Sequence, residues 1–126
     1  PDTTEEVCRC IFDSLALRYK QVFGYLMEMA PFPLETLHII GGGTQNVLLN
    51  QLTANATGVT VVTGPIECTA IGNIMLQAKA AGLVSDIRSM RALIAASIET
   101  KTYTPQDADL WEEAFKQYLS VCKEKE

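Results

Sequence analysis

A triple glycine at positions 41–43 separates a short apolar run from a segment with helical periodicity. Glycine loses more backbone freedom on folding than any other residue, so three in succession are costly to order. The run before them, residues 35–40, predicts a strand, and the leucines after them predict a helix that ends at Gly58. A β-branched strand follows at residues 59–63. This order predicts a βαβ unit with parallel strands and a right-handed crossover.

Further helices are predicted on both sides of this unit. The first begins with a capping box of Thr3 and Glu6 and ends before Pro31. Its apolar residues recur every three or four positions and predict one buried face: Val7, Ile11, Leu15, Tyr19, Val22, Phe23, Leu26 and Met29. The next helix spans residues 67–81, and another is capped by Ser85 or Asp86.

The last predicted helix has Thr104 as its N-cap and Pro105 at its first position. Five of its residues form the expected buried stripe: Leu110, Trp111, Phe115, Tyr118 and Leu119. The charged tail after residue 122 is expected to be frayed.

The predicted sheet is too small for its type. Parallel strands are normally buried on both faces in sheets of several strands, yet the sequence predicts only two. The fold class is therefore α/β, with helices around a short, incomplete parallel sheet. Because two strands are too few for such a sheet, we expect the sheet to continue in residues that precede Pro1. The chain also starts without a methionine, so we expect it to be processed or a piece of a longer protein.

Composition narrows the class of function. A formal net charge of −5, with basic residues scattered along the chain, argues against a protein that follows a nucleic-acid backbone. We find no signal peptide, and no apolar run reaches the roughly 18 residues that a membrane helix needs. Four cysteines without a CxxC pair are expected to be buried reduced thiols, which suits the cytoplasm: Cys8, Cys10, Cys68 and Cys122.

The glycines predict a place where a phosphate or a flat ring approaches bare main chain at a helix N-terminus. A GxGxxG dinucleotide motif begun at Gly41 would need a third glycine where the chain has Asn46. A Walker loop is excluded, because no lysine lies between Lys20 and Lys79. A tight connection that binds no ligand remains the structural alternative.

Residues 37–73, "LHIIGGGTQNVLLNQLTANATGVTVVTGPIECTAIGN", resemble the adenosine-motif region of the FGGY family of carbohydrate kinases. The flanking segments "CIFDSLALRYK", "IRSMRALIAAS" and "YTPQD" resemble the same family, most closely its members that phosphorylate L-rhamnulose. The resemblance implies an actin-like ATPase (ribonuclease H-like) fold, in which the chain is the C-terminal portion of the second, ATP-binding domain, residues 1–126.

The resemblance also implies what the segment does. It would bind ATP through Gly42, with Gly41 and Gly43 shaping the turn and with Gln45 and Asn46 as polar partners of the adenine or ribose. The catalytic base, the magnesium ligands and the sugar contacts would lie in preceding parts of the protein, so the segment alone would be inactive. Its partners would be ATP, a small ketose and that missing N-terminal part. Other sugars of the family (xylulose, fuculose, glycerol) and a free-standing nucleotide-binding module remain alternatives.

Other polar residues have structural explanations. His38, alone on a predicted strand, is expected to be a hydrogen-bonded core residue. Asp107 and Asp109 fall in the first turn of the last predicted helix, where carboxylates favour the helix dipole, so no metal site is predicted. Glu67 is expected to be a first-turn charge of the same kind.

Overall fold

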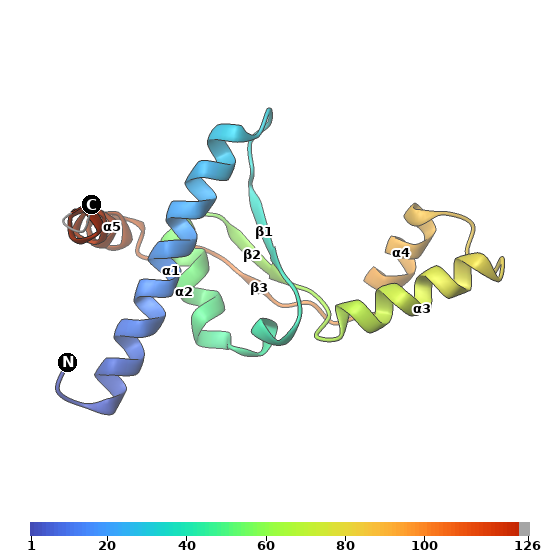
Figure 1. Ribbon diagram of the computed structural model, residues 1–126, viewed down its shortest axis with the longest axis horizontal. Coiled ribbons are helices and arrows are strands. Elements are labelled where there is room, and N and C mark those ends of the chain that lie inside the picture. The colour runs from blue at the N-terminus through green and yellow to red at the C-terminus, as the bar shows by residue number, and fades with distance from the viewer. Residues whose placement is uncertain (124–126) are drawn as a thin grey trace. The chain divides into compact units, whose positions relative to one another are not determined.

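The computed structural model describes residues 1–123, so the expected fraying of the tail falls on residues 124–126, outside the described part. Figure 1 shows the order of the elements along the chain. Their bounds are α1 Thr4–Met29, β1 Thr36–Ile39, the 3-10 turn η1 Gly42–Gln45, α2 Val47–Thr57, β2 Thr60–Thr63, α3 Cys68–Ala80, α4 Ile87–Ser97, β3 Thr102–Tyr103 and α5 Ala108–Lys123.

The chain divides into two compact units. Unit 1 consists of Pro1–Leu37, Asn46–Val61 and the chain from Thr102 onward. Unit 2 consists of His38–Gln45 and Val62–Lys101. The predicted α/β fold class is confirmed by this mixture of helices with a small sheet.

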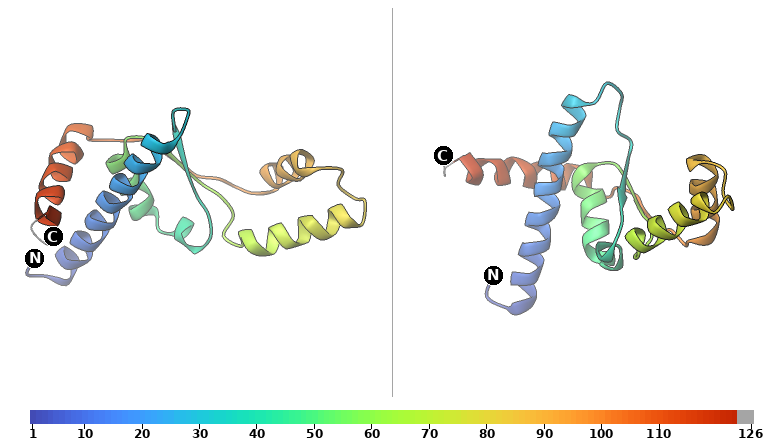
Figure 2. Two further views of the ribbon diagram at one scale, coloured as in Figure 1. Left: turned by 45° about the horizontal axis from the view of Figure 1, so that its top comes forward. Right: turned by 45° about the vertical axis from the view of Figure 1, so that its right-hand side comes forward.

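In unit 1 the helices α1, α2 and α5 pack against one another. The two views of Figure 2 show α1 and α2 side by side. The predicted capping box starts α1: the Glu6 N–H donates to Thr3 Oγ1 over 3.2 Å, and the Thr3 N–H donates to Glu6 Oε2 over 3.3 Å. Gly58 ends α2 in the left-handed conformation, as predicted. A buried hydrophobic cluster in this unit is formed by Ala16, Leu17, Leu52, Ala56 and Trp111.

The face of α1 that packs is not the predicted one. Of the eight apolar residues expected to be buried, only Phe23 is buried, at 6% exposure. The helix instead packs through Phe12, Ala16 and Leu17. A helix with apolar residues around most of its circumference can bury either side, and the sequence pattern alone does not decide between them.

Unit 2 contains the helices α3 and α4. Asp86, one of the two predicted caps, starts α4 by accepting the Ser89 N–H over 2.7 Å. Gly82 adopts a left-handed conformation after α3. No residue of α3 is buried, and α4 buries only Met90. These helices therefore have little core of their own within the described residues.

The sheet has three strands in the order β1-β2-β3, which is one strand more than the sequence predicted. Just beyond β1 and β2, the Gly64 N–H donates to the Ile39 carbonyl and the Gly41 N–H donates to the Pro65 carbonyl. From Ile39 to Gly41 on the β1 side, the hydrogen-bond partners move from Gly64 to Pro65 on the β2 side. The two segments therefore run in the same direction, as in the predicted parallel pair. The third strand has only two residues, and the backbone before it is held by Thr63, whose N–H donates to the Lys101 carbonyl over 2.9 Å.

Helix α5 begins later than predicted, at Ala108, because Thr104 and Pro105 belong to a linker held by α2. The residue before the helix, Asp107, has a left-handed φ of 53°. Trp111 is buried and Phe115 and Tyr118 pack against the core, as predicted, whereas Leu110 is 68% exposed.

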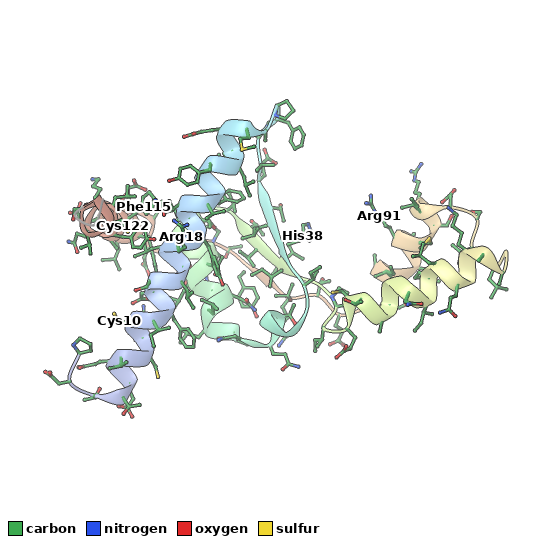
Figure 3. All side chains as sticks on the ribbon, in the orientation of Figure 1. Cys10, Arg18, His38, Arg91, Phe115 and Cys122 are labelled. Atoms are coloured by element: carbon green, nitrogen blue, oxygen red, sulfur yellow. The ribbon has the colours of Figure 1, made fainter. Side chains whose placement is uncertain are left out.

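Two smaller predictions are wrong. The four cysteines are free thiols, but Cys8, Cys10 and Cys122 are exposed rather than buried. His38 is also exposed, on β1 (Figure 3). Across residues 1–123 we find no helix with the length and apolar character that crossing a membrane requires.

Candidate functional site

The triple glycine forms a tight turn between β1 and α2. Gly41 has a φ of +81°, a left-handed conformation that favours glycine. Thr44 holds the turn closed, because its N–H and its hydroxyl donate to the Gly41 carbonyl over 3.1 and 2.7 Å. The Gly41 N–H donates to the Pro65 carbonyl over 2.9 Å. The turn is therefore fixed at both its ends.

The three glycines differ in whether the local structure explains a glycine at that position. Gly41 is explained by its conformation, and a Cβ on Gly43 would make ordinary contact with Ile39 at 3.7 Å. Gly42 is exposed, has no left-handed φ, and a Cβ added to it would meet no atom of the described chain within 4 Å. Within residues 1–123, neither conformation nor packing requires glycine at position 42.

A second turn lies beside the glycine turn, where β2 ends. The Gly64 N–H donates to the Ile39 carbonyl over 2.7 Å. A Cβ on Gly64 would come within 2.9 Å of Ile40 Cγ2, so a larger residue there would force the Ile40 side chain to shift. The carboxyl ends of two adjacent parallel strands thus meet at one edge, which is where open α/β sheets bind ligands.

The two predicted polar residues follow the turn directly. Gln45 ends η1 and is exposed. Asn46 is the N-cap of α2, and its Oδ1 accepts the Leu49 N–H over 3.0 Å. The oxygen of Asn46 is therefore committed to the helix, and a ligand contact from this residue would come from its amide NH₂.

A buried polar network on α2 was not predicted from the sequence. Asn55, 7% exposed, accepts hydrogen bonds at Oδ1 from the Gln51 side chain over 2.7 Å and from the Gln106 N–H over 3.0 Å. Gln51 also donates to the Thr104 carbonyl over 2.8 Å. These bonds fix the linker before α5 against α2. The sequence signal for this network is that α2 carries amide and hydroxyl side chains at positions that the structure buries, among them Asn50, Thr53 and Asn55.

Helices α1 and α5 are joined by charged and aromatic contacts. Lys20 Nζ lies 2.6 Å from Glu112 Oε2 and 5.0 Å from the centre of the Phe115 ring. The hydrogen bond from Lys20 lowers the pKa of Glu112. Burial, followed by a hydrogen bond with the Cys122 thiol, raises the pKa of Tyr118. Figure 3 labels Phe115 and Cys122 on α5.

The remaining polar residues do not gather into a site. Glu67 occupies the N-cap position of α3 but makes no side-chain capping bond. Asp109 lies in the first turn of α5, as predicted. Among residues 1–123, no group of three or more His, Cys, Asp or Glu side chains is placed to hold a metal ion.

Sequence comparisons connect this chain to sugar kinases. A family model for the C-terminal domain of FGGY carbohydrate kinases matches residues 1–81. Rhamnulokinase from Bacteroides thetaiotaomicron is 55% identical over 115 residues, which cover 91% of this chain and 24% of the relative. Rhamnulokinase from Bacillus subtilis is 43% identical over 109 residues, 86% of this chain and 22% of the relative. The chain thus spans about a quarter of the length of these relatives.

Solved structures agree on the fold. Gluconate kinase from Lactobacillus acidophilus superimposes with a TM-score of 0.72 and 21% identity, covering 92% of this chain and 23% of that protein. A ligand-bound xylulose kinase from the same organism gives a TM-score of 0.62 and 19% identity, covering 82% of this chain and 21% of that protein. At these identities, the likeness shows the fold alone.

Proposed function

The chain belongs to the FGGY family of carbohydrate kinases, and on this premise we propose that it is the ATP-binding, C-terminal portion of the second actin-like domain of a longer kinase. The complete protein would transfer the γ-phosphoryl group of Mg-ATP to the 1-hydroxyl of L-rhamnulose in rhamnose breakdown. The choice of sugar is supported by the rhamnulokinase relatives, at 43 to 55% identity. A cytoplasmic location accompanies this function, because ATP is the phosphate donor.

The observation that carries the nucleotide site is the bare main chain at Gly42. The residue is exposed, and its glycine has no explanation in the conformation or packing of the described chain. A flat nucleoside can lie against such a surface, where a side chain would stand between ring and backbone. The left-handed Gly41 and the clamp of Thr44 hold that surface in place.

Polar partners of the nucleotide would come from the start of α2. The exposed Gln45 amide can donate and accept, and the Asn46 NH₂ can donate while its oxygen caps the helix. Phosphoryl transfer depends on positioning and on stabilising the charge of the transferring group. In this proposal residues 41–46 position the adenosine, and the magnesium ligands and catalytic base lie in other parts of the complete protein.

Substitution of Gly42 by valine in the complete protein tests this site. The branched side chain would occupy the space assigned to the nucleoside, so we expect ATP binding to weaken at least about tenfold, or about 1.4 kcal/mol. The thermal unfolding midpoint should stay near that of the parent, because Gly42 is exposed and a Cβ there meets no atom of the described chain within 4 Å. Isothermal titration calorimetry with an ATP analogue measures the affinity directly.

Gly72→Val is the matched control, since a Cβ at Gly72 in α3 also meets no atom within 4 Å. Its ATP affinity should equal that of the parent. Unchanged affinity in Gly42→Val, or an equal loss in both variants, would contradict the proposed site. A panel of ketoses and glycerol tests the substrate separately, with L-rhamnulose expected to be the best acceptor.

A further inference from the structure

Helix α1 carries a long apolar stripe that the described chain leaves largely exposed. We define the α1 stripe as seven residues spaced by three or four positions: Val7, Ile11, Leu15, Tyr19, Val22, Leu26 and Met29. Their exposure runs from 37% at Leu15 to 80% at Met29. From Val7 to Met29 the stripe is roughly 33 Å long at a rise of 1.5 Å per residue. Exposed apolar patches of this extent mark interaction surfaces.

The stripe is separate from the face that forms the core of unit 1. Core contacts of α1 come from Phe12, Ala16 and Leu17. The seven stripe residues are apolar apart from the Tyr19 hydroxyl, and one charged residue, Arg18, lies on the same arc of the helix, roughly 20° from Val7 and from Ile11. A solvent-facing helix surface normally carries several charges, so seven apolar residues with a single arginine among them fit burial of most of this arc.

The angular width of the stripe indicates what kind of surface could cover it. At 100° per residue, the three successive four-residue steps from Val7 to Tyr19 shift the apolar positions by roughly 120° around the helix. A two-helix coiled-coil seam alternates steps of three and four and stays narrow. The α1 stripe instead matches the broad face that a helix buries against a larger surface, such as a sheet or several helices.

The relatives indicate where such a surface would come from. The chain spans about a quarter of their length, and the matching family model describes a C-terminal domain. We propose that the N-terminal part of the complete protein packs an apolar surface against the α1 stripe. This inference rests on the proposal that the chain is a segment of a longer kinase, but not on the nucleotide site.

Cysteine accessibility in the complete protein tests the proposal. Cys10 is exposed and lies roughly 120° around α1 from Val22, outside the stripe. Two single-cysteine proteins are compared, with every other cysteine changed to serine: one keeps Cys10, and the other carries Val22→Cys with Cys10→Ser. Valine and cysteine have similar volumes, which keeps the disturbance of the stripe small. Reaction with a water-soluble maleimide is followed by mass spectrometry, and each rate is divided by its rate in denaturant.

We expect the cysteine at position 22 to react at least about tenfold more slowly than Cys10 at every protein concentration, because it reacts only after local opening. Equal normalised rates would overturn the proposal. Protection of position 22 that appears only as the protein concentration is raised would also overturn it, since a second copy would then be the cover. Circular dichroism melting of both proteins verifies that they are folded, and loss of ATP binding would not alter either result.

Discussion

At the scale of single residues, the glycines of the two turns differ in what the structure requires of them. Gly41 has a left-handed φ, Gly64 leaves room for Ile40, and Gly42 has neither reason within the described chain. The sequence predicted that bare backbone is needed at positions 41–43, but it could not separate these reasons. Separating them requires the dihedral angles and the neighbours of each residue, which depend on the fold.

This distinction predicts that replacing glycine by alanine affects stability differently at positions 64 and 42. Gly64→Ala places a methyl group 2.9 Å from Ile40 Cγ2, so we expect it to lower the free energy of unfolding by about 1–2 kcal/mol. Gly42→Ala should change it by less than about 0.5 kcal/mol, because the methyl group enters open space. Urea unfolding followed by circular dichroism measures both. Equal losses would show that Gly42 is also constrained by packing.

At the scale of elements, local patterns predicted the helices well where local interactions decide the ends. The capping box of α1, the glycine after α2 and the aspartate cap of α4 lie within four residues of the groups they bind. Strand β3 and the late start of α5 were missed, because residues 38 to 53 positions away hold these segments through Thr63, Gln51 and Asn55. Long-range bonds of this kind override local propensity.

The polar network on α2 should contribute strongly to stability. Asn55→Ala leaves the Gln106 N–H without its acceptor, so we expect a loss of about 1–3 kcal/mol in the free energy of unfolding. Gln51→Ala, the control, keeps the bond from Gln106 to Asn55 and should cost less. Urea unfolding of the single and double variants gives the coupling energy. A smaller effect of Asn55→Ala than of Gln51→Ala would refute this assignment.

The cap of α4 should depend on pH. The hydrogen bond from the Ser89 N–H lowers the pKa of Asp86, so its stabilisation is present above the ordinary aspartate pKa and is lost as the pH falls through the lowered value. We expect Asp86→Asn to keep the cap and lose this pH dependence, and Asp86→Ala to lose the cap at all pH values. Amide chemical shifts of Ser89 between pH 6 and pH 2 report the bond. A pH-independent Ser89 shift in the parent would be inconsistent with this account.

At the scale of the whole molecule, the sequence predicted the fold class but not how little of the chain is buried. The core cluster draws on α1, α2 and α5, while α3 buries no residue and the α1 stripe remains exposed. Periodicity shows that a helix has an apolar face, but it does not show whether the partner of that face lies in the same segment. On our proposal that the chain is a segment of a longer protein, the exposed α1 stripe is a face that the rest of that protein would cover.

The candidate site was also only partly predictable. The position of the turn between β1 and α2 followed from the sequence, and the structure adds its neighbour at Gly64 and Pro65, through hydrogen bonds between residues that are 24 and 25 positions apart. The role of Asn46 as a helix cap was missed, although asparagine before a helix is a common N-cap.

The most direct test is a crystal structure of the complete protein with a non-hydrolysable ATP analogue. Our account predicts that the adenosine lies flat against the glycine turn, with ring or ribose atoms within about 4.5 Å of the Gly42 main chain. A nucleotide bound elsewhere, with Gly42 facing only solvent or other side chains of the protein, would contradict it.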